Sequence, residues 1–302
     1  MNERTMEDRP VFVIGADRSG TTLLRLLLTS HPLICIPPES LFFPLNESRF
    51  AGSLQMSGQL EEFITSLYQD GKFRDWKLDR DRLAERLHGL SDPDYATVVK
   101  NVYLLYVEMN APGALIWGDK NPYNLFHVSV IKRHFPEARI LHIIRDVRAV
   151  YHSLKDETIR KQWEISEPLT DFVRQRYQQV HKVHTGLLGD RNYFSLHYEE
   201  LVRHPEKMMK EVCSFLRVDY DPSMLDFHRI NRERELVPRH RLGWHAMTLK
   251  PVSGRRANAW RKGLTSEEIR EIEHENALYL KDLGYAPAAR RCVFSFAKWF
   301  KR

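Results

Sequence analysis

Short apolar runs alternate along the chain with longer segments in which apolar positions recur every three or four residues. Residues 11–15 (VFVIG) form an apolar run that stops at a glycine, and the leucine-rich period of residues 21–30 then predicts a helix. Residues 139–144 (RILHII) are typical of a strand that is buried on both faces. Residues 193–197 are a third strand candidate.

The other periodic segments predict amphipathic helices. A proline opens one of them at Pro205, and Pro136 ends another. Strands that alternate with helices indicate an α/β fold with a central parallel sheet and helices on both faces. The predicted helices cover residues 57–70, 79–89, 94–109, 124–135, 148–155, 169–188, 205–216 and 266–280.

The composition favours one domain over residues 1–302. An apolar fraction of 42% in 302 residues is enough to bury a full core, and no linker or internal repeat divides the chain. We therefore expect a core over residues 10–290 and a basic, aromatic tail over residues 291–302. The net charge of +6 suits an anionic ligand but is too small for a nucleic-acid-binding stripe, so no nucleic acid partner is expected.

The cysteines and the termini bear on localisation. Three cysteines without metal-binding or CxxC spacing argue against a disulfide framework and against a structural zinc site. The charged N-terminus does not resemble a signal peptide, and no run of 18 apolar residues would span a membrane. These features predict a cytoplasmic protein. The tail, with Lys298, Lys301 and Arg302 among aromatic residues, either contacts an anionic membrane surface or forms a final helix on the body.

The first chemical signal is the segment between the first predicted strand and helix. Gly15 and Gly20, five positions apart, permit a tight turn whose backbone N–H groups and following helix N-terminus favour an anion. A nucleotide-hydrolysing loop would have a lysine after the second glycine, but Thr21 follows Gly20 here. The cation is Arg18, whose guanidinium suits a terminal phosphate or sulfate better than a metal-bound triphosphate.

The residues Arg18-Ser19-Gly20-Thr21-Thr22-Leu23 resemble the 5′-phosphosulfate loop of sulfotransferases that use 3′-phosphoadenosine-5′-phosphosulfate (PAPS). The form with arginine is similar to that of tyrosylprotein sulfotransferases and of a broad bacterial group. The resemblance implies a P-loop-like three-layer fold and transfer of a sulfuryl group from PAPS to a hydroxyl, with release of adenosine 3′,5′-bisphosphate (PAP). It also implies that Arg18, Ser19, Gly20, Thr21 and Thr22 bind the cofactor.

Further matches imply the rest of the cofactor site. In IIRDVRAVYHS, Arg145 and Ser153 resemble the 3′-phosphate site of the family, and Tyr198 in HYEELVRHPE would contact adenine. The segment LKPVSGRRANAW resembles the basic segment that closes over the cofactor. A serine that the family uses near the sulfuryl group has no clear counterpart here, and Thr248 is a candidate to replace it. Ala259 stands where the family has a lysine. The implied basic partners are Arg255, Arg256, Arg261 and Lys262.

The resemblance also implies catalytic residues. Glu39 in HPLICIPPES would take the proton of the acceptor hydroxyl, and Lys120 in WGDKNP would stabilise the transferring group together with Arg18. Because these cations would supply the charge stabilisation, no metal is expected. The alternative to this role is that Glu39 is a surface carboxylate after the Pro-Pro turn.

The acceptor is the least defined part of the interpretation. Residues 37–44 (PPESLFFP) either wall an acceptor pocket with aromatic surface or anchor a loop in the core. We expect a small-molecule, lipid or glycan hydroxyl, with peptide tyrosine as an alternative. A P-loop kinase and a non-catalytic PAP-binding protein are the alternatives of other classes. The sequence leaves the oligomeric state open.

Overall fold

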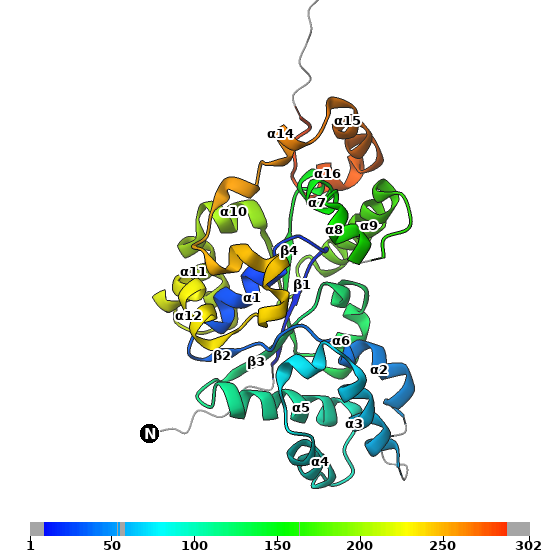
Figure 1. Cartoon of the computed structure of the whole chain (residues 1–302), viewed down its shortest axis with the longest axis vertical. Coiled ribbons are helices and arrows are strands. Elements are labelled where there is room, and N and C mark those ends of the chain that lie inside the picture. Colours follow the sequence, from blue (N-terminus) through cyan, green and yellow to red (C-terminus); the bar gives the residue numbers. More distant parts are fainter. Residues whose placement is uncertain (1–8, 53, 55–57, 163, 289–302) are drawn as a thin grey trace, which may run out of the picture.

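A five-stranded sheet forms the centre of the computed structural model, which describes residues 9–288 apart from residues 53, 55–57 and 163 (Figure 1). The strand order is β2-β3-β1-β4-β5, and all neighbouring strands are parallel. The predicted α/β fold with a parallel sheet is thereby confirmed, and the predicted tail lies outside the described residues. The strands are β1 (Val11–Ile14), β2 (Ile34–Cys35), β3 (Ile116–Lys120), β4 (Arg139–Ile144) and β5 (Tyr193–His197).

Helices connect the strands, because a parallel pair needs a crossover between its two members. The α-helices are α1 (Thr21–Thr29), α2 (Phe42–Phe50), α3 (Gln59–Gln69), α4 (Arg80–His88), α5 (Tyr95–Asn110), α6 (Val128–His134), α7 (Val147–Leu154), α8 (Glu157–Gln162), α9 (Leu169–Leu187), α10 (Tyr198–Arg203), α11 (Pro205–Leu216), α12 (Phe227–Arg234), α13 (Leu242–His245), α14 (Trp260–Gly263), α15 (Ser266–Glu275) and α16 (Ala277–Asp282). The 3₁₀ helices are η1 (Phe73–Trp76), η2 (Pro122–Phe126), η3 (Pro222–Asp226), η4 (Arg239–Arg241), η5 (Ala246–Leu249) and η6 (Gly254–Arg256).

The sheet is covered on both faces. Successive side chains of a strand point to opposite sides, so Phe12 and Ile14 join one apolar cluster, whereas Val11 and Val13 join the other. The first cluster includes side chains from α2, α5 and α9, and the second includes side chains from α1 and α11. These two clusters define the three layers of the fold.

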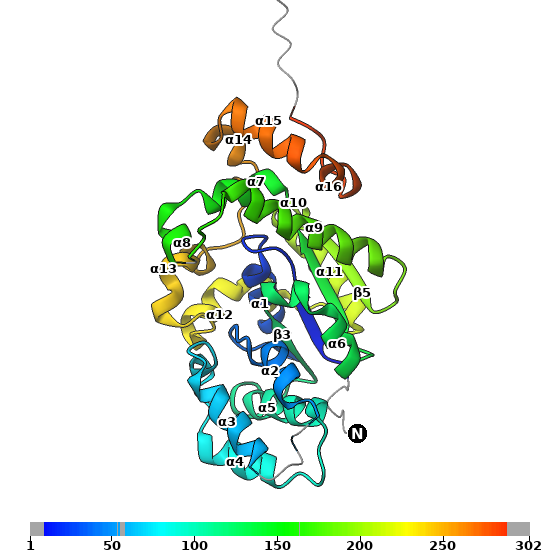
Figure 2. The ribbon, with the colours of Figure 1, turned by 90° about the vertical axis from the view of Figure 1, so that its right-hand side faces the viewer.

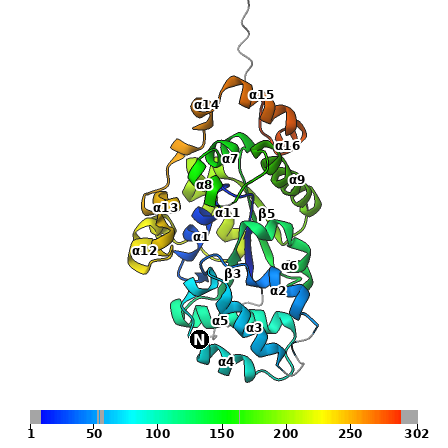
Figure 3. The same ribbon diagram turned by 45° about the vertical axis from the view of Figure 1, so that its right-hand side comes forward.

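Helices extend the molecule at both ends of its long axis. Figure 2 shows α3, α4 and α5 at one end and α14, α15 and α16 at the other, with the sheet between them. Figure 3 shows the C-terminal helices α15 and α16 above α7 and α9, and residues of these elements are in contact. In the described part of the chain, no helix combines the length and the apolar character that crossing a bilayer requires.

Several elements differ from the prediction. The strands β2 and β3 and the helix α2 were not expected, and the helix predicted over residues 124–135 is divided into η2 and α6. The strand β3 has the sequence IWGDK, yet all five residues are buried. The buried carboxylate of Asp119 accepts a hydrogen bond from Asn124 Nδ2 at 2.5 Å, so a polar sequence is accommodated inside the sheet.

Candidate functional site

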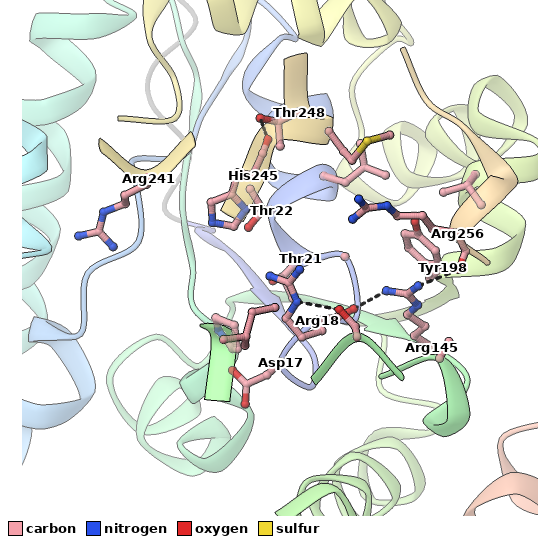
Figure 4. A pocket seen from close by; sticks show the side chains of 18 of the residues that line it. Asp17, Arg18, Thr21, Thr22, Arg145, Tyr198, Arg241, His245, Thr248 and Arg256 are labelled. Carbon is pink, nitrogen blue, oxygen red and sulfur yellow. Dashed lines mark hydrogen bonds between the residues drawn. The ribbon is translucent and has the colours of Figure 1, made fainter. Parts of the chain in front are cut away.

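A cavity of about 1270 Å³ lies at the carboxyl ends of β1 and β4, where ligands bind in open parallel sheets (Figure 4). Its lining brings together residues from the loop after β1, the end of β4, α7, α10 and the segment after α12. The residues of the predicted site that line it are Arg18, Gly20, Thr21, Thr22, Glu39, Arg145, Ser153, Tyr198 and Arg256.

The loop between β1 and α1 depends on unusual backbone conformations. Gly20, the N-cap of α1, has φ of 105°, and Arg18 has φ of 63° although it is not a glycine. A Cβ atom on Gly20 would lie 2.6 Å from Cδ2 of Tyr198, so the ring leaves no room for a side chain. Glycine at position 20 therefore lets the loop turn against the ring.

Two arginines and a serine are connected across this loop. Arg145 Nη1 donates to the carbonyl oxygen of Arg18 at 2.6 Å, and Arg18 Nε donates to Ser153 Oγ at 3.1 Å (Figure 4). The guanidinium of Arg145 also lies 4.2 Å from the ring centre of Tyr198, in a cation–π contact. The residues proposed for the two phosphate groups thus lie side by side. The roles of these residues toward a cofactor stay predictions.

Unused polar groups make this part of the cavity fit a phosphate-bearing ligand. Arg145 lines the cavity, and its Nε atom is buried and forms no hydrogen bond with a described residue, whereas Ser19, whose Oγ is also unpaired, does not line the cavity. Helix α1 has no side-chain cap, so the N–H groups of its first turn also lack a side-chain acceptor. Buried donors without partners are costly, and an anion at the helix N-terminus would satisfy several of them together.

Glu39 lies between two lysines. Lys120 Nζ donates to Glu39 Oε2 at 2.8 Å, and Lys72 Nζ donates to Oε1. Burial favours the neutral carboxyl group, but the two ammonium groups outweigh this effect and hold the pKa of Glu39 well below its ordinary value. Burial also lowers the pKa of Lys120, although Glu39 opposes the shift. The carboxylate is therefore ionised near pH 7, and the same two cations make it a weaker base than a carboxylate without such partners.

Lys72 was not predicted from the sequence. It lies in a turn after α3 that Asp70 fixes, since Oδ1 of Asp70 accepts the N–H of Lys72 and Oδ2 accepts Ser40 Oγ, both at 2.8 Å. This turn thereby places Lys72 over Glu39, the residue before Ser40. The sequence around it, QDGKF, is typical of a turn but carries no signal of what the turn faces.

His245 is a second residue of the site that the sequence did not reveal. It lines the cavity at the end of α13, and burial together with the nearby Lys120 and Arg18 lowers its pKa to about 3 (Figure 4). Its imidazole is therefore neutral near pH 7. The hydroxyl of Thr248 donates to the carbonyl oxygen of His245 at 2.5 Å, so its proton stabilises this turn in the described conformation.

The basic residues of the C-terminal segment occupy different positions. Arg256 lines the cavity, and its carbonyl oxygen accepts Arg145 Nη2 at 3.1 Å. Arg255 and Lys262 are exposed, and Arg261 lies 4.4 Å from the ring centre of Trp260. Cofactor contacts by these last three residues stay predictions.

The aromatic residues near Glu39 belong to the core and do not wall the cavity. Phe42 and Phe43 begin α2, and their exposed fractions are 3% and 1%. Phe42 packs edge-on against Phe63 and Trp76, with ring centres 6.5 and 5.7 Å apart. Of the two interpretations of residues 37–44, the structure therefore supports the core-anchoring one.

The comparisons with known proteins agree with this geometry. The profile of the sulfotransferase family matches residues 10–222 of the chain. The chain belongs to the sulfotransferase family. It is a PAPS-dependent enzyme, and the family assignment replaces the kinase interpretation.

Relatives and solved structures give the range of this similarity. The protein-tyrosine sulfotransferase 1 of Danio rerio is 23% identical over 287 residues, which cover 94% of this chain and 74% of that protein. The protein-tyrosine sulfotransferase of Drosophila melanogaster is 23% identical over 291 residues, but the match spans only 52% of that protein.

Among solved structures, the sulfotransferase domain of the Synechococcus PCC 7002 olefin synthase has a TM-score of 0.63 and 19% identity, covering 95% of this chain and 98% of that one. The sulfotransferase domain from the curacin biosynthetic pathway has a TM-score of 0.63 and 17% identity, with 94% and 100% coverage. These structures confirm the P-loop-like sulfotransferase fold.

Proposed function

We propose that this sulfotransferase transfers the sulfuryl group of PAPS in line to the hydroxyl of a small-molecule, lipid or glycan acceptor, with Glu39 as the general base. The observation that carries the proposal is the meeting of an ionised, lysine-bound Glu39 and the Arg18–Arg145–Ser153 group in one cavity. A volume of about 1270 Å³ exceeds the roughly 300–1,000 Å³ of a pocket for one small ligand, so a donor and an acceptor fit together.

The donor would lie along the loop after β1. Ser19, Thr21 and Thr22, together with the free N–H groups at the start of α1, would hold the 5′-phosphate. Arg145 and Ser153 would hold the 3′-phosphate, and Tyr198 would contact the adenine ring. When bound, PAPS supplies the sulfuryl group and a phosphate that can leave.

Charge stabilisation comes from residues that the fold holds in place. The backbone of Arg18 has φ of 63°, and its carbonyl oxygen accepts a hydrogen bond from Arg145. This conformation keeps the guanidinium of Arg18 inside the cavity, where negative charge grows on the leaving phosphate. Lys120 is 3% exposed and lies within 3.5 Å of Thr22 Oγ1 as well as beside Glu39. Lys120 does not itself line the cavity, so the role that these contacts support is to orient the base, and its contact with the sulfuryl oxygens stays a proposal.

Glu39 removes the proton of the attacking hydroxyl. Both of its oxygens are bonded to lysines in the described structure, so an acceptor hydroxyl would use a remaining lone pair of the carboxylate or take the place of one ammonium. Lys72 is the one that can leave, because its side chain is 34% exposed whereas that of Lys120 is 4% exposed. An acceptor that takes the place of an ammonium would displace Lys72 and keep Lys120 in position.

A second candidate acceptor is tyrosine in a peptide. This candidate is supported by relatives that match more than nine-tenths of this chain and are named protein-tyrosine sulfotransferases. A peptide would reach the same base in the same way, so the two candidates differ in the acceptor but not in the chemistry.

Radiolabelled PAPS with a panel of acceptors tests the proposal. The panel contains simple phenols, hydroxylated lipids, oligosaccharides and a tyrosine peptide with its phenylalanine counterpart as control. Calorimetric titration of PAP without metal, with magnesium-ATP as comparison, tests the donor site in parallel. We expect PAP to bind and Arg145→Ala to weaken it; magnesium-ATP binding in place of PAP would contradict the donor assignment.

A further inference from the structure

One peptide group beside the cavity is held at both its polar atoms. It joins Arg145, which lines the cavity, to Asp146, the N-cap of α7. The hydroxyl of Tyr177 donates to its carbonyl oxygen, and Oε1 of Glu199 accepts its N–H at 3.1 Å. Side chains from α9 and α10 therefore fix the plane of this peptide, and with it the backbone from which Arg145 extends into the cavity.

Glu199 is the neighbour of Tyr198, and both lie in the first turn of α10. The ring centre of Tyr198 lies 4.2 Å from the guanidinium of Arg145 (Figure 4). Helix α10 thus holds Arg145 at its side chain through Tyr198 and at its backbone through Glu199. Ser153 lies in α7, which starts at the residue after Asp146, so the same junction also sets where Ser153 lies relative to Arg145.

Glu199 is itself held by a tyrosine from the C-terminal segment. The hydroxyl of Tyr285 donates to Oε2 of Glu199 at 2.9 Å, and Nδ1 of His197 lies 2.9 Å from the same hydroxyl. A hydroxyl has one proton and a carboxylate can only accept, so His197 is the donor in the second contact. Burial and the nearby Glu199 raise the pKa of Tyr285 well above its ordinary value, so the hydroxyl keeps the proton that it donates.

Tyr285 belongs to a part of the chain that the family profile does not cover. The match to the profile ends at residue 222, whereas Tyr285 follows α16 near the end of the described residues. The next residue, Ala286, is tied to α7, because Arg148 Nη2 donates to its carbonyl oxygen at 3.1 Å. The C-terminal segment therefore reaches the Arg145 junction along two routes, through Glu199 and through α7.

We propose that Glu199 is a positioning residue for PAPS and that the hydroxyl of Tyr285 sets its position, so the C-terminal segment controls the affinity for the donor. This inference rests on the proposed function, which assigns Arg145 and Ser153 to the 3′-phosphate. A guanidinium that is fixed before binding loses less conformational freedom when the phosphate arrives, so the affinity is higher. Neither Glu199 nor Tyr285 needs to touch the cofactor, because they act through the peptide group before Asp146.

Calorimetric titration of PAP into Tyr285→Phe, without metal, tests the proposal. The substitution removes a hydroxyl and little volume, and we expect the Kd for PAP to rise about 3–10-fold, the range that one hydrogen bond supports. Glu199→Leu should weaken PAP binding at least as much. Glu199→Gln should keep most of the affinity, since its amide can still accept from Asp146 and donate toward Tyr285.

Tyr193→Phe is the matched control. The hydroxyl of Tyr193 lies 2.8 Å from His142 Nδ1 and 3.0 Å from His184 Nδ1, so this substitution also removes a hydroxyl that is bonded to histidine. It should lower the melting temperature, as Tyr285→Phe does, but leave the Kd for PAP close to that of the wild type. A rise in Kd of the same size in both variants would mean that a general loss of stability explains the effect, and would overturn the proposal.

Arg145→Ala separates this inference from the donor assignment. If Tyr285 acts through Arg145, Tyr285→Phe should cause little or no further loss of PAP affinity in the Arg145→Ala background. An equal further loss, or no effect of Tyr285→Phe in the wild-type background, would overturn the inference and leave the donor assignment intact. If Arg145→Ala itself bound PAP as tightly as the wild type, the donor assignment and this inference would both be wrong.

Discussion

The ammonium group of Lys120 lies 2.8 Å from Oε2 of Glu39, and this pair joins two segments that are 81 residues apart in the chain. Lys120 ends the buried strand β3, so its position is set by the sheet, and Glu39 follows β2 beside it. The rigid partner keeps the carboxylate ionised and aimed into the cavity. A carboxylate that is held by a buried cation can still accept a proton through the lone pairs that the cation leaves free.

Lys72→Met should shift the pH dependence of transfer. Lys72 and Lys120 both lower the pKa of Glu39, so the loss of one cation raises that pKa. The base must be ionised to act, and the acidic limb of kcat/KM should therefore move to higher pH by about one unit or more. Lys72→Arg should keep the limb of the wild type. An unchanged limb in Lys72→Met would show that Glu39 does not govern it.

Gly20→Ala should destabilise the protein and weaken PAP binding. The new Cβ atom would lie 2.6 Å from the Tyr198 ring in a backbone with φ of 105°, so we expect a loss of about 2 kcal/mol or more in the free energy of unfolding. Gly58→Ala is the control, because Gly58 also caps a helix at positive φ but has open space around it. Urea unfolding measures the free energy of unfolding of both variants. Equal losses would remove the contact with Tyr198 from the explanation.

Arg148→Met should loosen the packing of the C-terminal helices α15 and α16 on α7 and α9. The buried guanidinium of Arg148 donates to Asp146 Oδ2 at 2.7 Å and to Glu273 Oε1 at 2.5 Å, and it lies 4.2 Å from the ring centre of Trp260. Removal of one member of a buried ion pair costs about 3–5 kcal/mol. The rate of backbone amide hydrogen exchange in α15 should therefore increase.

The control for Arg148 is an exposed ion pair on the same side of the molecule. Arg174 lies 3.0 Å from Asp171 and 3.9 Å from Glu275 of α15, and the exposed fractions of the three side chains are 42%, 46% and 42%. Arg174→Met should therefore change the free energy of unfolding by only about 0–1 kcal/mol. If the two substitutions gave similar losses, burial of the Arg148 group would not be what stabilises the C-terminal helices.

Features that depend on neighbouring residues in the chain could be predicted from the sequence. The strand β1, the loop to Gly20 and helix α1 form one local unit, and the apolar run of β4 ends directly at Arg145. Parallel strands bring such loops to the same side of the sheet, and the two segments that the resemblance assigned to one cofactor do meet there, with Arg145 bonded to the carbonyl oxygen of Arg18.

Features that depend on tertiary partners could not be predicted. The strand β3 is polar in sequence and becomes a strand because β1 and β2 pair with it on both sides. Pro44 resembles a loop residue, yet it lies in the first turn of α2. The N–H groups of a first turn form no hydrogen bond within the helix, so a proline there removes none. Lys72 reaches Glu39 across 33 residues through a fold of the chain that no local pattern encodes.

Glu39→Gln tests the central claim most directly. The amide keeps the shape of the side chain but cannot accept the acceptor proton, so kcat should fall by about 10²–10⁴-fold while the calorimetric Kd for PAP stays close to that of the wild type. Turnover with labelled PAPS and PAP titration are measured on the same preparation. A low kcat with unchanged PAP affinity is the result we expect. Near-wild-type turnover would contradict the assignment of Glu39 as the base.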